Sequence, residues 1–287
     1  MTDIPPNDPP NNAIADGLVD IPAPDAESAT VLIDSTVGGA VTVTINRPAR
    51  RNAFDSETIA ALHEAFETLH GQDHVRVVFV RGAGGTFSAG ADLDWMRRAV
   101  EWSEADNRDD AMMLAKMLKA LHDVPALTVA LVEGAAMGGG AGLVAACDMA
   151  VATEEAKFAF SEAKLGLTPA TISPYVVEAV GPRRARALFA TARMFDAAEA
   201  QVFGLVDEVV DAGGLDAVRD RIAADILACA PGAVAAAKAL VNHVHGHRLN
   251  HDLLDDTAKR IAARRVSPEG QEGVRAFLER RKPNWAV

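Results

Sequence analysis

The stretch LVEGAAMGGGAGLVAACD, residues 131–148, decides how this chain folds. An apolar run breaks there into three consecutive glycines and continues as an alanine-rich pattern, which predicts a strand, a bare turn and the start of a helix. Glycine lets a ligand reach the backbone because it has no Cβ, and the first N–H groups of a helix lack partners within the helix. Those amides would stabilise a carbonyl oxygen that gains negative charge. The alternative is a glycine-rich turn that binds nothing.

A second glycine-rich turn, FSAGADL, occupies residues 87–93. It follows an apolar run at 75–82 and precedes a helical pattern at 109–121, as the first turn follows a run at 127–132. The continuous apolar character of both runs is typical of strands in a sheet that helices cover on both faces. The order strand, glycine-rich turn, helix therefore occurs twice.

The remaining chain divides into three predicted parts. Residues 1–28 are rich in Pro, Asn and Asp without apolar periodicity, which predicts a mobile tail. Residues 29–200 are expected to form an α/β core that opens with a hairpin at 30–46 and a helix at 55–69. Residues 201–287 are expected to be a helical C-terminal region. The expected helices after the core strands are 182–192, 197–203, 215–229, 231–245, 249–264 and 268–282.

Composition excludes several classes of protein. With 287 residues, 49% of them hydrophobic, the chain can bury a large core. No apolar run reaches the roughly 18 residues that span a bilayer, and the polar N-terminus does not resemble a signal peptide, so a cytoplasmic location is expected. The formal net charge of −12 argues against general binding to nucleic acid or a membrane surface. Cys147 and Cys229 lie in apolar helical patterns and do not indicate a disulfide.

Three motifs in order, INRPARRNAF at 45–54, FSAGADL and MGGGAGL at 137–143, resemble the crotonase family, also called the enoyl-CoA hydratase/isomerase superfamily. The resemblance extends from about residue 30 to the C-terminal RKPNW. It implies an α/β fold, a spiral of repeated ββα units with a helical C-terminal region. It also implies an acyl-CoA thioester as ligand and a homotrimer or dimer of trimers, whose C-terminal helices assist oligomerisation and cover a neighbouring site.

The resemblance assigns the site residue by residue. The amides of Ala89 and Gly139 would form the oxyanion hole for the thioester carbonyl, with Glu162 as the catalytic acid–base group. Arg50 resembles the basic position that meets the CoA phosphates, although a solvated surface arginine is the alternative. The positions expected to contact substrate or CoA are Arg50, Arg51, Ala53, Ser88, Ala91, Asp92, Leu93, Gly138, Gly142, Phe277 and Arg280.

The number of carboxylates bears on the reaction. A typical hydratase of this family has two glutamates, and the corresponding positions here are Gly142 and Glu162. Hydration needs water activated at C3 and a proton delivered at C2, whereas one carboxylate can move a proton from C2 to C4 and so isomerise a double bond. One glutamate alone therefore favours an isomerase. The alternative for Glu162 is an exposed turn carboxylate paired with Lys164.

A finer resemblance favours hydration. The segment FSEAKLGLTPATISPYV, residues 160–176, is similar to a subgroup of hydratases that act on branched or glutaconyl-type CoA esters. That subgroup also has glycine at the position of Gly142, which would make room for a branched or polar acyl group. The expected activity is hydration of a 2-enoyl-CoA. A Δ3-Δ2 enoyl-CoA isomerase and a non-catalytic CoA-ester-binding protein stay open as alternatives.

Other chemistries fit less well. The stretch Thr86–Gly90 lacks the first glycine of a nucleophile elbow, and Leu143 stands where a dinucleotide-binding turn needs glycine. Four histidines at 243, 245, 247 and 251 bring no carboxylate or cysteine at metal-ligand spacing. No metal or redox cofactor is expected, and coenzyme A enters as part of the substrate.

Overall fold

The computed structural model describes residues 29–286 and contains a main sheet of six strands. The predicted tail at 1–28 lies outside the described residues. The strands are β1 (Val31–Ser35), β2 (Ala40–Ile45), β3 (Val77–Gly82), β4 (Leu127–Val132), β6 (Met149–Thr153) and β9 (Glu208–Val210), in that spatial order. The first two form the expected antiparallel hairpin, and the later neighbours pair in parallel.

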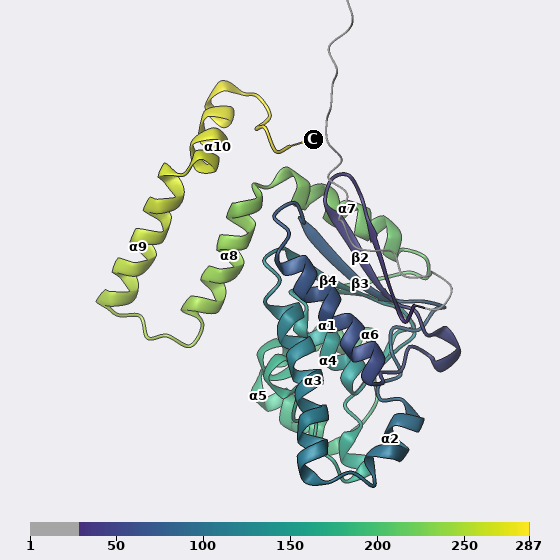
Figure 1. Cartoon of the computed structure of the whole chain (residues 1–287). Helices are drawn as coiled ribbons and strands as arrows, with labels where there is room; N and C mark the ends of the chain where they lie inside the picture. The colour runs from purple at the N-terminus through teal and green to yellow at the C-terminus, as the bar shows by residue number, and fades with distance from the viewer. Residues whose placement is uncertain (1–28, 287) are drawn as a thin grey trace, which may run out of the picture.

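Helices cover both faces of this sheet, as the continuous apolar strands predict. In β3, Val78 and Val80 join the core on one face, while Val77 and Phe79 pack with the α7 residues on the other. Figure 1 shows α1 and α3 side by side over the first face. The helices are η1 (Pro48–Arg50), α1 (Ser56–His70), α2 (Leu93–Ala99), α3 (Glu104–His122), α4 (Gly139–Ala146), η2 (Glu162–Leu165), α5 (Ser173–Thr191), α6 (Ala197–Phe203), α7 (Leu215–Ala228), α8 (Pro231–Val244), α9 (His251–Val266) and α10 (Pro268–Glu279).

A smaller second sheet lies past the ends of the main strands. It consists of β5 (Ala135–Met137), β7 (Lys157–Ala159) and β8 (Phe195–Asp196). The chain therefore repeats one unit, a main-sheet strand, a second-sheet strand and a helix, as β4–β5–α4 and β6–β7–α5. This arrangement confirms the expected repetition of ββα units.

The boundary between the α/β core and the C-terminal helical region lies later in the chain than predicted. The core does not end near residue 200, because β9 pairs in parallel with β6 and α7 buries Leu215, Val218 and Ile222 against the main sheet. The predicted C-terminal region therefore begins at α8 rather than at residue 201. The short strands β8 and β9 and the helix α2 were not predicted. The predicted helix at 109–121 is also longer, since a capping box at Ser103 starts α3.

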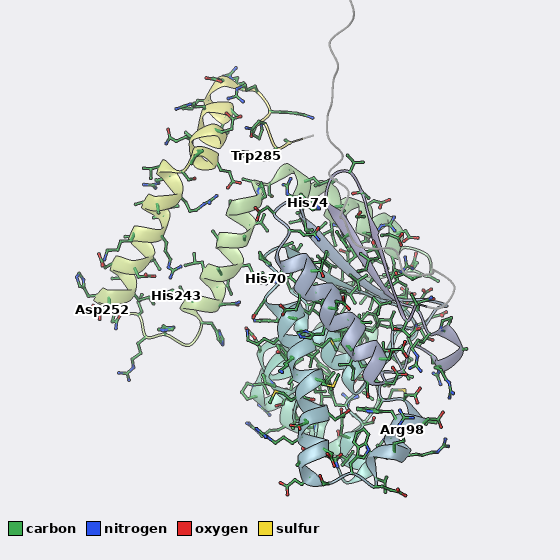
Figure 2. All side chains as sticks on the ribbon, in the orientation of Figure 1. His70, His74, Arg98, His243, Asp252 and Trp285 are labelled. Atoms are coloured by element: carbon green, nitrogen blue, oxygen red, sulfur yellow. The ribbon has the colours of Figure 1, made fainter. Side chains whose placement is uncertain are left out.

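The C-terminal arm, residues 231–286, holds α8, α9 and α10. Figures 1 and 2 show α9 and α10 standing apart from the α/β core, with side chains on both sides of α9 outside any core. Lys238 on α8 anchors the arm through an ion pair of 2.7 Å with Asp148, and the Trp285 indole N–H donates to the carbonyl of Ala228. Within residues 29–286 no single helix is both long and apolar enough to cross a membrane; α7 and α8 meet that test only jointly, and they are bent by 101°.

Candidate active site

Three segments meet here: residues 51–54 after β2 and η1, residues 87–92 after β3, and the turn that follows β5. Residues 51–54 run parallel to 89–92, where the Phe54 N–H donates to the Gly90 carbonyl at 2.7 Å and the Asp92 N–H to the Phe54 carbonyl at 2.8 Å. On the other side, the Met137 N–H donates to the Ser88 carbonyl at 2.9 Å. Gly90 has φ +88°, and a Cβ there would lie 2.8 Å from the Met137 carbonyl oxygen. Close approach of the loops therefore requires glycine at this position.

The turn from β5 into α4 leaves the backbone amide of Gly139 without a partner among the described residues. Gly138, with φ 49° and ψ −117°, bends the chain and donates its own N–H to the Ala159 carbonyl at 2.8 Å. Among the described residues, no acceptor takes the N–H of Gly139, which is half-exposed. A free N–H at the start of a helix can donate to an anionic or polarised oxygen. The turn therefore has the geometry that the triple glycine predicts.

The corresponding amide in the first loop is occupied. The Ala89 N–H donates to the Arg51 carbonyl at 2.9 Å, because the parallel ladder between 51–54 and 89–92 uses it. The next amide, on Gly90, lies 3.2 Å from the Ser88 hydroxyl. The expectation of a free amide at Ala89 is thus wrong for this structure, and a two-amide hole would require the Ala89–Arg51 bond to open.

Glu162 is the carboxylate at this turn. It begins η2, and its carbonyl accepts the Leu167 N–H at 3.0 Å, which closes the loop behind it. Its Oε1 lies 3.3 Å from where a Cβ on Gly138 would stand, and its Oε2 is buried with no partner among residues 29–286. Burial raises the pKa of the Glu162 carboxyl above its usual value. The alternative of a Glu162–Lys164 ion pair is wrong, since no such pair forms in the described chain.

Comparison with known proteins gives this geometry a family. The family model for enoyl-CoA hydratase/isomerase matches residues 36–287. Enoyl-CoA hydratase EchA19 of Mycobacterium tuberculosis is 34% identical over 252 residues, which cover 86% of this chain and 93% of that protein. The chain belongs to the enoyl-CoA hydratase/isomerase family. The crystal structure of an enoyl-CoA hydratase from Shewanella pealeana agrees at a TM-score of 0.87 and 37% identity, covering 91% of this chain and 97% of its own. The structure of Pseudomonas aeruginosa AtuE agrees at a TM-score of 0.86 and 37% identity, covering 90% of this chain and 100% of its own.

In this hydratase/isomerase family member, position 142 has no space for a side chain. A Cβ on Gly142 would lie 2.1 Å from Ile172 Cγ2 and 2.6 Å from Ile172 Cβ. Ile172 is 1% exposed and precedes α5. The expectation that Gly142 makes room for an acyl group is therefore wrong, because Ile172 already fills that space.

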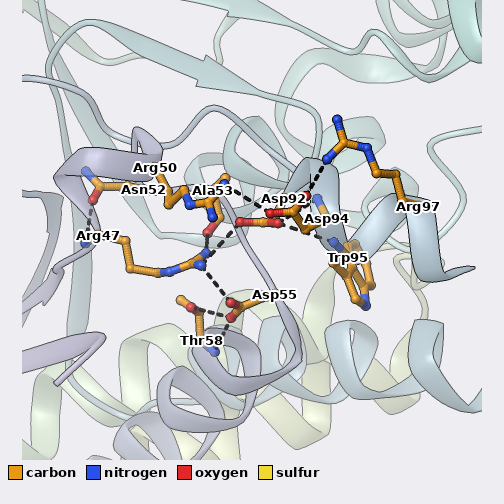
Figure 3. A network of polar contacts seen from close by, with 10 residues as sticks. All are labelled: Arg47, Arg50, Asn52, Ala53, Asp55, Thr58, Asp92, Asp94, Trp95 and Arg97. Carbon is orange, nitrogen blue, oxygen red and sulfur yellow. Dashed lines mark hydrogen bonds and ion pairs between the residues drawn. The ribbon is translucent and has the colours of Figure 1, made fainter. Parts of the chain in front are cut away.

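The basic residues of the first motif divide between the interior and the surface. Arg47 lies at the centre of a network in which its guanidinium is 2.7 Å from Asp55 and 3.2 Å from Asp92 and also donates to the Ala53 carbonyl (Figure 3). Arg50 is exposed and paired at 3.2 Å with Asp94. Arg50 thus lies on the surface in an exposed ion pair, while Arg47 holds the loops together. The sequence shows the arginine cluster but not this division.

Asp92 has a structural role that the sequence did not predict. Its Oδ1 accepts the N–H groups of Asp94 and Trp95 and so caps α2, while its Oδ2 faces Arg47. Burial alone would raise the pKa of Asp92, but the two helix amides and Arg47 outweigh it, and the pKa is lowered. Both oxygens of this carboxylate already have partners in the chain, which argues against direct contact with CoA.

The other predicted binding positions fall into two groups. Ser88 and Ala53 are buried in the loop contacts, while Arg51, Ala91 and Leu93 are exposed beside them. Ser88 contacts the glycine turn directly, since its carbonyl accepts the Met137 N–H, and the ladder between 51–54 and 89–92 links the other segment to it.

The structure does not bring the α10 positions to this turn within one chain. Phe277 is 81% exposed, Arg280 is also exposed, and Figure 1 shows their helix on the arm, apart from the core. The arm histidines lie there too, where His243 pairs with Asp256 at 2.9 Å and stacks on His247. No group of three or more His, Cys, Asp or Glu that could hold a metal ion occurs in residues 29–286.

Proposed function

We propose that this chain adds water across the double bond of a 2-enoyl-CoA thioester, with Glu162 as its acid–base group. The observation that carries the proposal is the buried, unpartnered Oε2 of Glu162 beside the open Gly138–Gly139 turn. A carboxylate without a partner next to the free amide of Gly139 supplies a proton acceptor and an oxyanion donor in one place.

One carboxylate can complete the reaction in two steps. Glu162 accepts a proton from water as the water oxygen bonds to C3, and the π electrons of the C2–C3 bond move to the thioester oxygen. The protonated Glu162 then delivers that proton to C2, which restores the carbonyl and the carboxylate. The raised pKa of Glu162 favours holding the proton between these steps. Hydroxyl and proton would therefore add to the same face of the substrate.

The enolate oxygen is held at the start of α4. The Gly139 amide donates to it, and one such donor lowers the barrier by roughly 3 kcal/mol. A second donor becomes available when the Ala89 N–H exchanges the Arg51 carbonyl for the substrate oxygen. The Ala89–Arg51 bond is an ordinary backbone bond at a loop edge, whose net contribution of about 1 kcal/mol is small beside a charge-assisted bond.

The substrate enters as a CoA ester, so no separate cofactor is required. Branched and glutaconyl-type esters are the first to test, because residues 160–176 resemble that hydratase subgroup. Arg50 and Arg51 are exposed cations at the loop rim and suit the CoA phosphates of an otherwise acidic chain. We further propose assembly as a homotrimer or dimer of trimers, in which the arm places Phe277 and Arg280 against a neighbouring site.

A Δ3-Δ2 enoyl-CoA isomerase is the second candidate. It is favoured by the closed position 142, which leaves Glu162 as the carboxylate at the turn. A single group that removes a proton at C2 and returns it at C4 completes that reaction without water.

One assay separates these functions. Purified protein is incubated with crotonyl-CoA, a 3-enoyl-CoA and 3-methylglutaconyl-CoA, and the absorbance of the conjugated enoyl thioester is followed. Loss of absorbance from a 2-enoyl ester supports hydration, gain from the 3-enoyl ester alone supports isomerisation, and binding without any change supports a non-catalytic protein. Glu162→Gln should lower turnover by about 100-fold or more, whereas Glu155→Gln on an exposed turn should not. Unchanged turnover in Glu162→Gln would refute the assigned role.

A further inference from the structure

The segment that carries Glu162 is tied to the amide turn at both of its ends. At one end the Gly138 N–H donates to the Ala159 carbonyl at 2.8 Å. At the other end Ile172 occupies the space in which a Cβ of Gly142 would stand. Between these two contacts the chain runs through η2, so Glu162 faces Gly138 from a loop fixed on both sides.

The second of these contacts depends on the shape of the isoleucine side chain. Its Cγ2 methyl is the atom closest to the missing Cβ of Gly142, at 2.1 Å, and its Cβ follows at 2.6 Å, while Cδ1 is farther away at 3.5 Å. The branch at Cβ therefore makes the approach to α4. Valine keeps this branch with one carbon fewer, whereas leucine has the same number of atoms and no branch at Cβ.

Backbone hydrogen bonds connect Ile172 to α5 on one side and connect Gly142 to the amide turn on the other. The Ile172 carbonyl accepts the Val176 N–H at 3.1 Å and so begins α5, and the Gly142 N–H donates to the Gly138 carbonyl at 3.0 Å. Gly142 thus lies one turn beyond Gly138 in the same helical start. A displacement of Ile172 would move the loop of Glu162 relative to the amides of that turn.

We propose that Ile172 is a positioning residue, whose β-branched side chain, seated on the backbone of Gly142, holds Glu162 at the distance from the amide turn that the reaction needs. This inference rests on the proposed role of Glu162 as the acid–base group. It assigns Ile172 no contact with the reacting atoms. Its effect is on the chemical step and not on binding of the CoA portion, which the exposed arginines of the first motif serve.

The test compares Ile172→Val and Ile172→Leu in the full chain, with kcat, KM and thermal unfolding measured for each. Ile172→Leu should lower kcat by about 10- to 100-fold through misplacement of Glu162. KM for the CoA ester should change less than about threefold, since uniform binding is not removed. Ile172→Val should keep kcat within about threefold of the parent, because the Cγ2 contact persists. Leu188→Ile, an isomeric swap at a buried position beyond the Gly181 break in α5, is the matched control and should leave kcat unchanged.

Each outcome decides between the two proposals. Equal kcat values for Ile172→Val and Ile172→Leu, with turnover lost in Glu162→Gln, would overturn the role of Ile172 and leave the function standing. A fall in kcat that follows the unfolding temperature in both variants and in Leu188→Ile would also overturn it. Full turnover in Glu162→Gln would overturn the proposed function first, and the role of Ile172 with it.

Discussion

Two glycine-rich turns of similar sequence, FSAGADL at 87–93 and MGGGAGL at 137–143, use their backbone amides differently. In the first turn, the N–H groups of Ala89 and Asp92 donate to the carbonyls of Arg51 and Phe54. In the second, the Gly139 N–H has no acceptor among the described residues, and the nearby carboxylate is that of Glu162. Glycine content alone therefore does not determine whether an amide is free. The neighbouring segment decides it.

The difference has a physical origin in what packs beside each turn. Residues 51–54 lie parallel to the first turn and use its amides in a ladder, which the Arg47 network reinforces (Figure 3). The second turn is backed by side chains, Phe54 3.3 Å from a Cβ position on Gly139 and Ile172 at Gly142. Side chains can limit space without consuming hydrogen-bond donors. The second turn is therefore both crowded and open to a ligand.

The largest effect on stability is expected at Gly142, the most crowded position of the second turn. Gly142→Ala places a Cβ within 2.1 Å of Ile172 and should cost about 3 kcal/mol of unfolding free energy, because α4 and the start of α5 cannot move apart freely. Chemical denaturation measures this directly. Gly71→Ala is the control, since its φ is −84° and the nearest atom to a new Cβ is 3.8 Å away. That variant should stay within about 1 kcal/mol of the parent. Equal stability of both alanine variants would show that the second turn is not crowded.

A smaller effect is expected at the ladder of the first turn. Asp92→Asn removes the charge that faces Arg47 while it keeps an oxygen for the α2 cap, and should cost about 2 kcal/mol of unfolding free energy. Asp94→Asn interrupts only exposed ion pairs with Arg50 and Arg97 and should cost less than about 1 kcal/mol. Both are measured by urea unfolding. A larger loss in Asp94→Asn than in Asp92→Asn would contradict the idea that the buried network holds this turn.

Periodic stretches of the sequence predicted the fold well, and short ones did not. The bounds predicted for the strand at 127–132 and the helix at 197–203 match β4 and α6. The two- and three-residue strands β8 and β9 are too short to show alternation, so the core boundary was placed too early. Helix α2 was missed because its cap, Asp92, lies inside a glycine-rich stretch that reads as a loop.

At the site, too, sequence motifs predicted some residues, while contacts between segments far apart in the chain were not predicted. Motifs that resemble a known family pointed to Glu162 and Gly139, and the structure places the Glu162 carboxylate beside Gly138. The contact of Ile172 with Gly142, the pair of Arg47 with Asp92 and the engagement of Ala89 all depend on segments distant in the chain. One sequence without its fold contains no signal for such packing. These are the points at which the two turns differ.

The smallest effect concerns stability at the open turn and depends on pH. Burial raises the pKa of the Glu162 carboxyl in the folded chain. In the unfolded chain the same carboxyl ionises near the ordinary glutamate pKa of about 4.3, so it ionises at a lower pH there than in the folded chain. The parent therefore loses stability as pH rises from that value through the raised pKa, and Glu162→Gln does not. The thermal midpoint of Glu162→Gln should exceed that of the parent at pH 8, and the two should converge below about pH 4. Glu155→Gln, on an exposed turn, is the control for the loss of one surface carboxylate. A constant difference across this range would mean that the carboxylate at the second turn is solvated, and the contrast between the two turns would then rest on their amides alone.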